Sequence, residues 1–459
     1  MLSDGMNLAE RLSAYAQSIS YADLGEDAVQ AAKQRILDSL GCAIGAFGEP
    51  PVKIARRVVE SSHSNGASSI LGTETKTSPD MATFVNGLMV RYFDYNDTYL
   101  SKEPAHPSDN LASCLAVGER EDASGKDLLT ALALAYEIQC RLCDAADIRH
   151  RGWDHVCYGL VSSALAAGKL MCLTTQKLTQ AVNISLNGHI AMRQVRAGEI
   201  SEWKGASFAN AARNAVFSSM LAARGMTGPS PIFEGEMGFF NQVSGPFELN
   251  TESFGGAGRP FKLVETYVKY FPAEYHSQSA IWAALQARSK IQTTGDIVSV
   301  DVETHEAGYN ILGRGKEKWA PSTRETADHS LPFIVAMALL NGRVDNSSYS
   351  PGNLRNPRVR SFMKRIDVRE DRTLTEAYPR HISNRVTLRL NDGRTVTEQV
   401  DDPKGHPNNP MTKDEVEAKF RRLTSRFLSE SAVRDIADFV WSLEKQRHAG
   451  ALAEICVVS

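Results

Sequence analysis

The stretch LVSSALAAGKLM at residues 160–171 decides the fold class, because small and apolar residues cover most of its surface when it is wound as a helix. A helix that is apolar nearly all round is stable only when other helices bury it. Two further apolar stripes have helical spacing, one over residues 28–44 and one over residues 81–92. The pattern from residue 24 to about residue 228 therefore predicts an all-α bundle.

The period of the pattern changes after about residue 260. In DIVSVDVET, Val298, Val300 and Val302 alternate with polar residues, which is the period of a β-strand. In RVTLRLNDGRTVTEQV, two alternating runs flank an Asp392-Gly393 turn, which is a strong hairpin signal. Because helical segments such as SQSAIWAALQAR are interspersed, this part of the chain is predicted to form a smaller α+β domain.

A helical pattern returns from Lys413 in KDEVEAKFRRLTSRF and SAVRDIADFVWSLE, and these segments are too short to form a domain alone. We expect them to rejoin the first bundle. The sequence thus predicts a mainly α fold, with a large all-helical domain from residues 1–265 and 405–459. The smaller α+β domain, a lid at residues 266–404, would be inserted between them.

Composition argues against several classes of partner. The 459 residues include 51 basic and 54 acidic ones, a formal charge of -3, so there is no basic field of the kind that holds nucleic acid. No apolar run approaches the roughly 20 residues that span a bilayer. The start, MLSDGMNLAERLSAYAQ, resembles an amphipathic helix more than a signal peptide. We therefore expect a cytoplasmic protein with neither a nucleic-acid nor a membrane partner.

The seven cysteines are scattered and odd in number, which argues against a disulfide framework. Cys140 and Cys143 form a C-x-x-C pair, which could supply two ligands to an iron–sulfur cluster. The pair lies within a continuous helical run, whereas a cluster loop normally breaks helices. Buried, reduced thiols are therefore the favoured interpretation.

The stretch FDYNDTYLSKEPAHPSDN at residues 93–110 gathers four acids, a threonine, a lysine and a histidine. Asp94 and Thr98 are four residues apart and would share one side of the preceding helix if that helix continued. The prolines that flank His106 direct the chain into a loop that carries this imidazole. The set suits acid/base chemistry. A helix end with Asx turns is the structural alternative.

Further candidate residues lie in three segments: His155 in RHRGWDHVCYG, Lys204 in EISEWKGASF, and Lys269 and His276 in KYFPAEYHSQSA. Cations beside turns suit an anionic ligand, although polar helix entries and solvated turns explain the same residues equally well. In STRETADHSLP, a structural ion-pair role is favoured over a catalytic one.

Together these segments resemble the MmgE/PrpD family, which contains 2-methylcitrate dehydratases, cis-aconitate decarboxylases and an iminodisuccinate epimerase. The resemblance covers almost the whole chain. It is carried in order by LDSLGCAIGAF, DYNDTYL with HPSDN, GWDHVCYG, EWKGASFANAARNAVF, FPAEYHSQSA, TRETADHSLP and KGHPNNPM. Seven segments in one order are far more specific than any single one of them.

The resemblance implies a homodimer of helical and lid domains, with a site between the domains that works without metal or organic cofactor. The residues that correspond to the family's site are these: His106, His155, Asp94 and Lys204 as catalytic residues, and Thr98, Lys269 and His276 as substrate-binding residues, with no metal ligand. The spacing between Thr98 and His106 is a little longer than in the decarboxylase branch, which favours a dehydratase, whereas the EWKG segment is closer to the decarboxylase and epimerase branches.

The chemistry of the residues agrees with this resemblance. Substrates of the family are di- or tricarboxylates, whose desolvation requires cations such as Lys204 and Lys269. Elimination of water from a hydroxy acid requires a base for the proton beside a carboxylate and an acid for the departing hydroxyl, and histidines can do both near neutral pH. The residues do not decide whether His106 or His155 is the base.

The predicted function is cofactor-independent dehydration of a hydroxy-tricarboxylate, most simply 2-methylcitrate to 2-methyl-aconitate in propionate breakdown. Within the enzyme class the alternatives are cis-aconitate decarboxylation and epimerisation of an amino-dicarboxylate such as iminodisuccinate. The non-enzymatic alternative is a helical dimer that only binds polycarboxylates.

Overall fold

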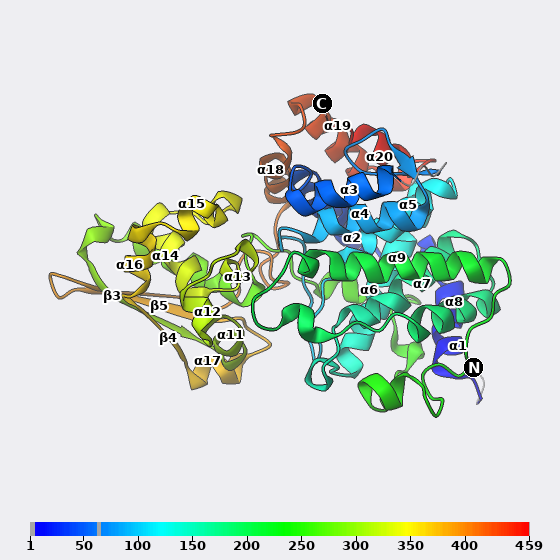
Figure 1. Ribbon diagram of the computed structural model, residues 1–459, viewed down its shortest axis with the longest axis horizontal. Coiled ribbons are helices and arrows are strands. Elements are labelled where there is room, and N and C mark those ends of the chain that lie inside the picture. Colours follow the sequence, from blue (N-terminus) through cyan, green and yellow to red (C-terminus); the bar gives the residue numbers. More distant parts are fainter. Residues whose placement is uncertain (1–4, 62–65, 459) are drawn as a thin grey trace. The chain divides into compact units, whose positions relative to one another are not determined.

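The computed structural model describes residues 5–61 and 66–458, and its fold is mainly α, which confirms the predicted fold class (Figure 1). The chain divides into two compact units. The first, called here the helical unit, comprises Met1–Val195, Glu202–Tyr267 and Thr412–Ser459. The second, called here the α/β unit, comprises Arg196–Ser201 and Val268–Met411.

The longer helices of the helical unit are α1 (Leu8–Ser18), α2 (Glu26–Gly45), α3 (Pro50–Glu60), α4 (Pro79–Arg91), α5 (Leu111–Arg120), α6 (Gly125–Ala145), α7 (Val156–Leu170), α8 (Thr175–Asn187), α9 (Trp203–Ala223), α18 (Lys413–Thr424) and α19 (Glu430–Trp441). A shorter helix, α20 (Ala451–Ile455), follows them. Helix α7, which contains the alanine-rich stretch, packs against α6, α8 and α9. Its burial by neighbouring helices explains why it needs no polar face.

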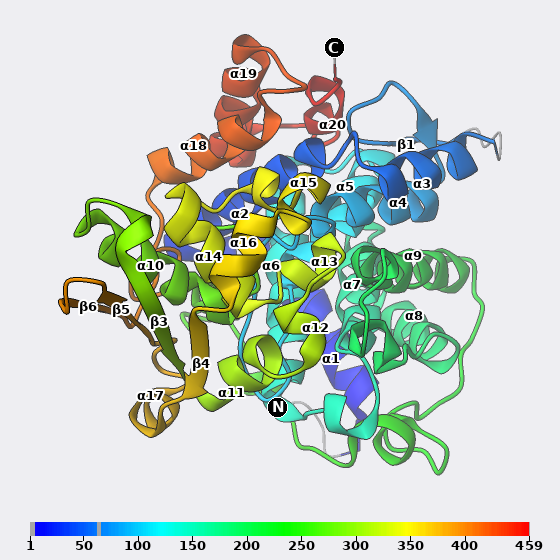
Figure 2. The ribbon, with the colours of Figure 1, turned by 60° about the vertical axis from the view of Figure 1, so that its left-hand side comes forward.

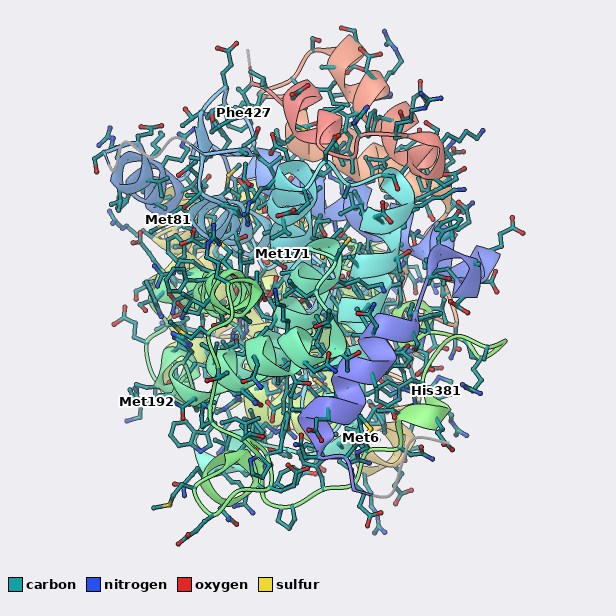
Figure 3. The ribbon with its side chains drawn as sticks, turned by 90° about the vertical axis from the view of Figure 1, so that its right-hand side faces the viewer. Met6, Met81, Met171, Met192, His381 and Phe427 are labelled. Atoms are coloured by element: carbon teal, nitrogen blue, oxygen red, sulfur yellow. The ribbon has the colours of Figure 1, made fainter. Side chains whose placement is uncertain are left out.

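Local signals fix several helix ends. Asn7 and Glu10 form a capping box at the start of α1, and Ser124 and Asp127 form one at the start of α6. Helix α1 packs against α8 (Figure 3). At the other end of the chain, α18 packs against α2, where Lys419 and Asp38 form a buried ion pair of 2.6 Å.

The helical unit also contains a short antiparallel pair, β1 (Ser68–Ser69) and β2 (Lys76–Thr77). The prediction of a purely helical domain was therefore wrong in this detail. The pair is only two residues long on each strand, which is too short for a period of two to be recognised in the sequence.

The α/β unit is built on a four-stranded sheet in the order β4-β3-β5-β6 (Figure 2). Its strands are β3 (Ile297–Thr304), β4 (Ile366–Glu370), β5 (Asn384–Leu390) and β6 (Thr395–Val400). Strands β5 and β6 form the predicted hairpin around Asp392-Gly393, whereas β4 runs parallel to β3. The helices of the unit are α10 (Gln278–Ser289), α11 (Glu306–Gly308), α12 (Lys316–Trp319), α13 (Arg324–Ala327), α14 (Leu331–Asn341), α15 (Pro351–Leu354), α16 (Pro357–Met363) and α17 (Arg372–Ala377). Helix α10 packs on β5 and β6, and α14 packs on α10 and β4.

The predicted alternation of β3 is correct at Val300 and Val302, which are fully buried, but wrong at Val298, which is 58% exposed. The pairing of β3 with β5 shifts register between Ile297 and Ser299. Such an irregularity inserts an extra residue, so Ile297 takes the buried position and Val298 turns outward.

The cysteines form no disulfide, and Cys140 and Cys143 are buried within α6. Burial raises the pKa of both thiols, which disfavours the thiolate form that a metal cluster requires. Within the described residues, no helix combines the length and the apolar character needed to cross a membrane.

Candidate functional site

A buried charge cluster joins the end of α4 to the start of α9 in the helical unit. The Arg91 Nη1 atom donates to Asp94 Oδ1 at 2.5 Å, and the Lys204 Nζ atom donates to Asp94 Oδ2 at 3.0 Å. All of these side chains are at most 5% exposed. The carboxylate of Asp94 thus balances part of the charge of two buried cations, and Arg91 Nε is also 3.8 Å from the buried Asp109 Oδ2.

Close helix packing brings these residues together from distant parts of the chain. A Cβ on Gly87 of α4 would lie 3.0 Å from the Cβ of Ala209 of α9, so the glycine allows the two helices to approach closely. Lys204, in the first turn of α9, therefore reaches Asp94 just beyond the end of α4.

Asp94 does not lie on a continued helix. Helix α4 ends at Arg91, and Asp94 has a positive φ of 50°, in the left-handed region. The helix thus does not continue, which was the condition under which Asp94 and Thr98 would share a helical face. Asp tolerates the left-handed conformation better than most residues, and here that conformation directs its carboxylate to the two cations.

The hydrogen bonds of His106 identify its tautomer. Its Nδ1 atom is 2.7 Å from the carbonyl oxygen of Asp97, which can only accept, so Nδ1 carries the proton. Its Nε2 atom is 2.9 Å from Arg91 Nη2, which can only donate, so Nε2 accepts. This is the pattern of a neutral imidazole whose basic nitrogen faces the charge cluster.

His155 lies next to His106, with the two ring centroids 5.7 Å apart. It precedes the first residue of α7, and its Nε2 atom is 3.8 Å from Asp154 Oδ1. The preceding loop is held in place by backbone bonds from Asp154 N to Ala191 O and from Arg193 N to Gly152 O, both 2.9 Å. Between these two bonds, Met192 points its side chain away from the protein (Figure 3).

The loop that carries His106 is fastened by buried polar groups. Asp97 accepts from Ser108 N at 3.0 Å and from the Tyr136 hydroxyl at 2.7 Å, and burial raises the pKa of its carboxyl group. The Thr98 hydroxyl donates to the carbonyl of Ala105 at 3.0 Å. Since that bond uses the only proton of the hydroxyl, Thr98 supports the loop and can offer another group only acceptor lone pairs.

Glu103, a third acid of the stretch, joins the loop to the segment before α7. One of its carboxylate oxygens accepts from Ile148 N and Arg149 N, both at 2.9 Å. Burial raises the pKa of Glu103 to about 7, in spite of these bonds and of Arg193 nearby. The carboxyl group is therefore half protonated near neutral pH.

This shift predicts a pH-dependent stability. The native state holds the Glu103 proton up to about pH 7 and the unfolded chain releases it near pH 4.5, so the stabilisation is complete below pH 4.5 and lost as pH rises through 7. Glu103→Gln, which is neutral at every pH, should gain about 3 kcal/mol relative to the wild type between pH 4.5 and pH 8. Urea unfolding of both proteins at the two pH values measures this gain. If the free energies of unfolding of Glu103→Gln and of the wild type differed by the same amount at both pH values, the raised pKa of Glu103 would be contradicted.

In the α/β unit, Glu274 is the centre of a second buried cluster. Its carboxylate accepts from the backbone N and the ring Nδ1 of His276, both at 2.8 Å. Burial alone would raise the pKa of Glu274, but the charges of His276, His329 and Lys269 lower it to about 2. An ionised carboxylate therefore accepts both hydrogen bonds from His276, and Lys269 and His276 are each at most 2% exposed.

The segment STRETADHSLP, for which a structural ion-pair role was predicted, contributes further contacts to this cluster. His329 Nδ1 contacts Asp328 Oδ1, and the backbone oxygen of Asp328 accepts from Glu274 N at 3.0 Å. Arg324 donates to the side-chain oxygen of Asn346 at 3.1 Å.

The structure therefore brings His106, His155, Asp94 and Lys204 together in the helical unit, and in the α/β unit it buries Lys269 and joins His276 to the Glu274 carboxylate. Sequence reasoning missed Arg91 and Glu274. Arg91 ends an otherwise apolar helical stripe, three residues before Asp94, and that spacing was an available signal.

Comparison with known proteins gives matches over most of the chain. The MmgE/PrpD N-terminal domain matches residues 10–252, and the MmgE/PrpD C-terminal domain matches residues 271–445. A 2-methylcitrate dehydratase of Cupriavidus necator is 29% identical over 414 residues, which are 83% of this chain and 82% of the relative. A 2-methylcitrate dehydratase of Escherichia coli K12 is 30% identical over 403 residues, 81% of this chain and 80% of the relative. An alkylcitrate dehydratase, phiI, of a fungal species is 30% identical over 438 residues, 86% of this chain and 83% of the relative.

Proposed function

The chain belongs to the MmgE/PrpD family, and from this premise we propose that it is a hydro-lyase that converts 2-methylcitrate to 2-methyl-aconitate. The observation that carries the proposal is the pair of His106, which is half-buried, and His155, which is buried, with ring centroids 5.7 Å apart, beside two buried cations that share one carboxylate. The names of the dehydratase relatives support the same reaction.

The proposed roles follow from the hydrogen bonds. His106 is the base, because its resting state is neutral with Nε2 as the acceptor. His155 is then the acid that protonates the departing hydroxyl. Arg91 and Lys204 offer N–H donors to a substrate carboxylate and stabilise the charge that develops beside it when the proton is removed. When Arg91 turns to the substrate, the lone pair of His106 becomes available.

Asp94 keeps the two cations in place, and Lys269 and His276 bind a further carboxylate of the substrate. Thr98 contributes by holding the loop of His106. No step of this scheme uses a metal ion or an organic cofactor.

A longer alkyl group on the citrate is a second candidate substrate, because one relative is named an alkylcitrate dehydratase. The reacting groups of both substrates are the same, so the proposed roles do not change. We further propose that the enzyme is a homodimer that acts in the cytoplasm.

The test is the ultraviolet absorbance of the purified protein mixed with 2-methylcitrate in the presence of a chelator. Dehydration creates a double bond conjugated with a carboxylate, so absorbance should rise, and His155→Ala should lower its rate by about a hundredfold or more. Release of carbon dioxide from cis-aconitate, or proton exchange in an amino-dicarboxylate without loss of mass, would instead identify a decarboxylase or an epimerase. No turnover with any of these substrates would favour a protein that only binds polycarboxylates.

A further inference from the structure

One end of the sheet in the α/β unit gathers buried polar atoms that have no hydrogen-bond partner among residues 5–61 and 66–458. These atoms are His276 Nε2, Thr304 Oγ1, His305 Nε2 and Asn384 Oδ1. The four residues are at most 2% exposed. A buried polar atom without a partner costs about 1–3 kcal/mol, so four in one place point to something that is bound there.

The four residues are neighbours in space. Thr304 ends β3 and lies opposite Asn384, the first residue of β5, in the register of the sheet. The Asn384 Nδ2 atom donates to the carbonyl oxygen of His276 at 2.8 Å, which leaves Oδ1 as the open side of that amide. The rings of His276 and His305 have centroids 5.0 Å apart.

Gly308 lies directly against these atoms and has no Cβ to displace them. A Cβ at this position would lie 2.4 Å from Thr304 Oγ1 and 3.4 Å from His305 Nε2. The two polar atoms therefore both lie next to Gly308, and a side chain at this position would collide with Thr304 Oγ1.

The bonds of His305 show that its open nitrogen is a donor. The backbone N of Gly308 donates to His305 Nδ1 at 3.2 Å, so in the neutral ring the proton is on Nε2. Burial, together with the nearby charge of His276, lowers the pKa of His305 to about 3, so the ring is neutral at physiological pH. Tyr378 stacks on this ring at 4.6 Å and fixes its plane.

Glu274 positions the second ring. Because its carboxylate accepts from the Nδ1 of His276, the Nε2 atom of that ring is turned away from the acid and is the one without a partner. The set therefore offers the Nε2–H of His305, the hydroxyl of Thr304 and the Nε2 of His276, with Asn384 Oδ1 as an acceptor.

We propose that His305, Thr304 and Asn384 join His276 in a subsite that binds a carboxylate and an adjacent hydroxyl of the substrate, with Glu274 as the positioning residue. Ring and hydroxyl donors suit carboxylate oxygens, and the amide oxygen of Asn384 suits a hydroxyl donor. This inference rests on the proposed function for the identity of the ligand, a hydroxy-polycarboxylate, but not on its dehydration.

The test distinguishes loss of the Nε2–H donor of His305 from loss of the structural contact between its Nδ1 and the Gly308 amide. His305→Asn keeps an acceptor for the Gly308 amide but has no atom at the Nε2 position, whereas His305→Gln can place an amide N–H there. Thr304→Val removes one hydroxyl with almost no change in shape and suits a strand. Calorimetric titration with citrate and with 2-methylcitrate measures binding by each full-length variant.

We expect His305→Asn and Thr304→Val each to weaken binding by about tenfold or more, and His305→Gln to recover most of the loss. If His305→Asn and Thr304→Val both bind these acids as tightly as the wild type does, the four atoms hold structural water only and the subsite is overturned. This conclusion holds whether or not the melting temperatures of the two variants fall. If the wild type binds these acids through His305 without turnover of 2-methylcitrate, the subsite stands and the proposed function fails. If the wild type turns over 2-methylcitrate and the variants retain its KM, the subsite fails and the proposed function stands.

Discussion

His106→Asn is expected to lower the turnover of 2-methylcitrate by about a hundredfold or more while changing its KM much less. The side-chain N–H of asparagine can take the place of Nδ1–H and donate to the carbonyl of Asp97, so the loop should keep its conformation. What is lost is Nε2, the accepting nitrogen beside Arg91. An amide cannot accept a proton near neutral pH, so the substrate would lose its base.

His150→Asn is the matched control. This histidine comes from the same segment as His155, but its side chain is 78% exposed and pairs with Asp147. Its replacement should leave turnover and KM unchanged. Measurement of kcat and KM for both variants, with their pH profiles, completes the test. If His106→Asn retained wild-type turnover, His106 could not be the base.

Asp94→Asn is expected to destabilise the protein by roughly 3–5 kcal/mol, because it leaves the buried charges of Arg91 and Lys204 without their shared carboxylate. Asparagine has the same size and also tolerates the positive φ of this position, so the effect isolates the charge. Activity should fall as well, since the cations that hold the substrate lose their orientation. Urea unfolding, followed at constant pH, measures the change in the free energy of unfolding.

Asp122→Asn provides a control with the same backbone geometry. Asp122 also has a positive φ, of 51°, but it is 74% exposed and pairs with the exposed His448. An exposed pair of this kind contributes at most about 1 kcal/mol. The double variant Asp94→Asn with Lys204→Met should recover part of the lost stability, because it also removes one of the two cations that Asp94 pairs with. Equal effects of Asp94→Asn and Asp122→Asn would contradict the buried cluster.

Much of the candidate site could be predicted because its residues lie in local motifs. The polar stretch after residue 92 and the prolines around His106 predicted a loop with acid/base groups, and the structure fastens that loop with buried acids. The family was predicted from seven ordered segments, and the matches to its N-terminal and C-terminal domains confirm it. The assigned roles stay proposals.

Residues that act through distant partners could not be predicted in the same way. Asp94 meets Lys204 across 110 positions of the chain, and no local pattern states which cation a carboxylate will meet. Asn384 meets His276 across 108 positions. His305 reads in the sequence as an isolated histidine after a strand, and only its neighbours show that its Nε2 is buried without a partner.

By itself, the sequence determined the period of each segment: helical in the first half, alternating around the Asp392-Gly393 hairpin, and helical again after residue 412. Those periods are local, since each depends only on which side chains follow one another. The tertiary structure alone decided the left-handed turn at Asp94, the register shift that exposes Val298, and the tautomer of His106. These features depend on burial and on hydrogen-bond partners that packing brings together from distant parts of the chain.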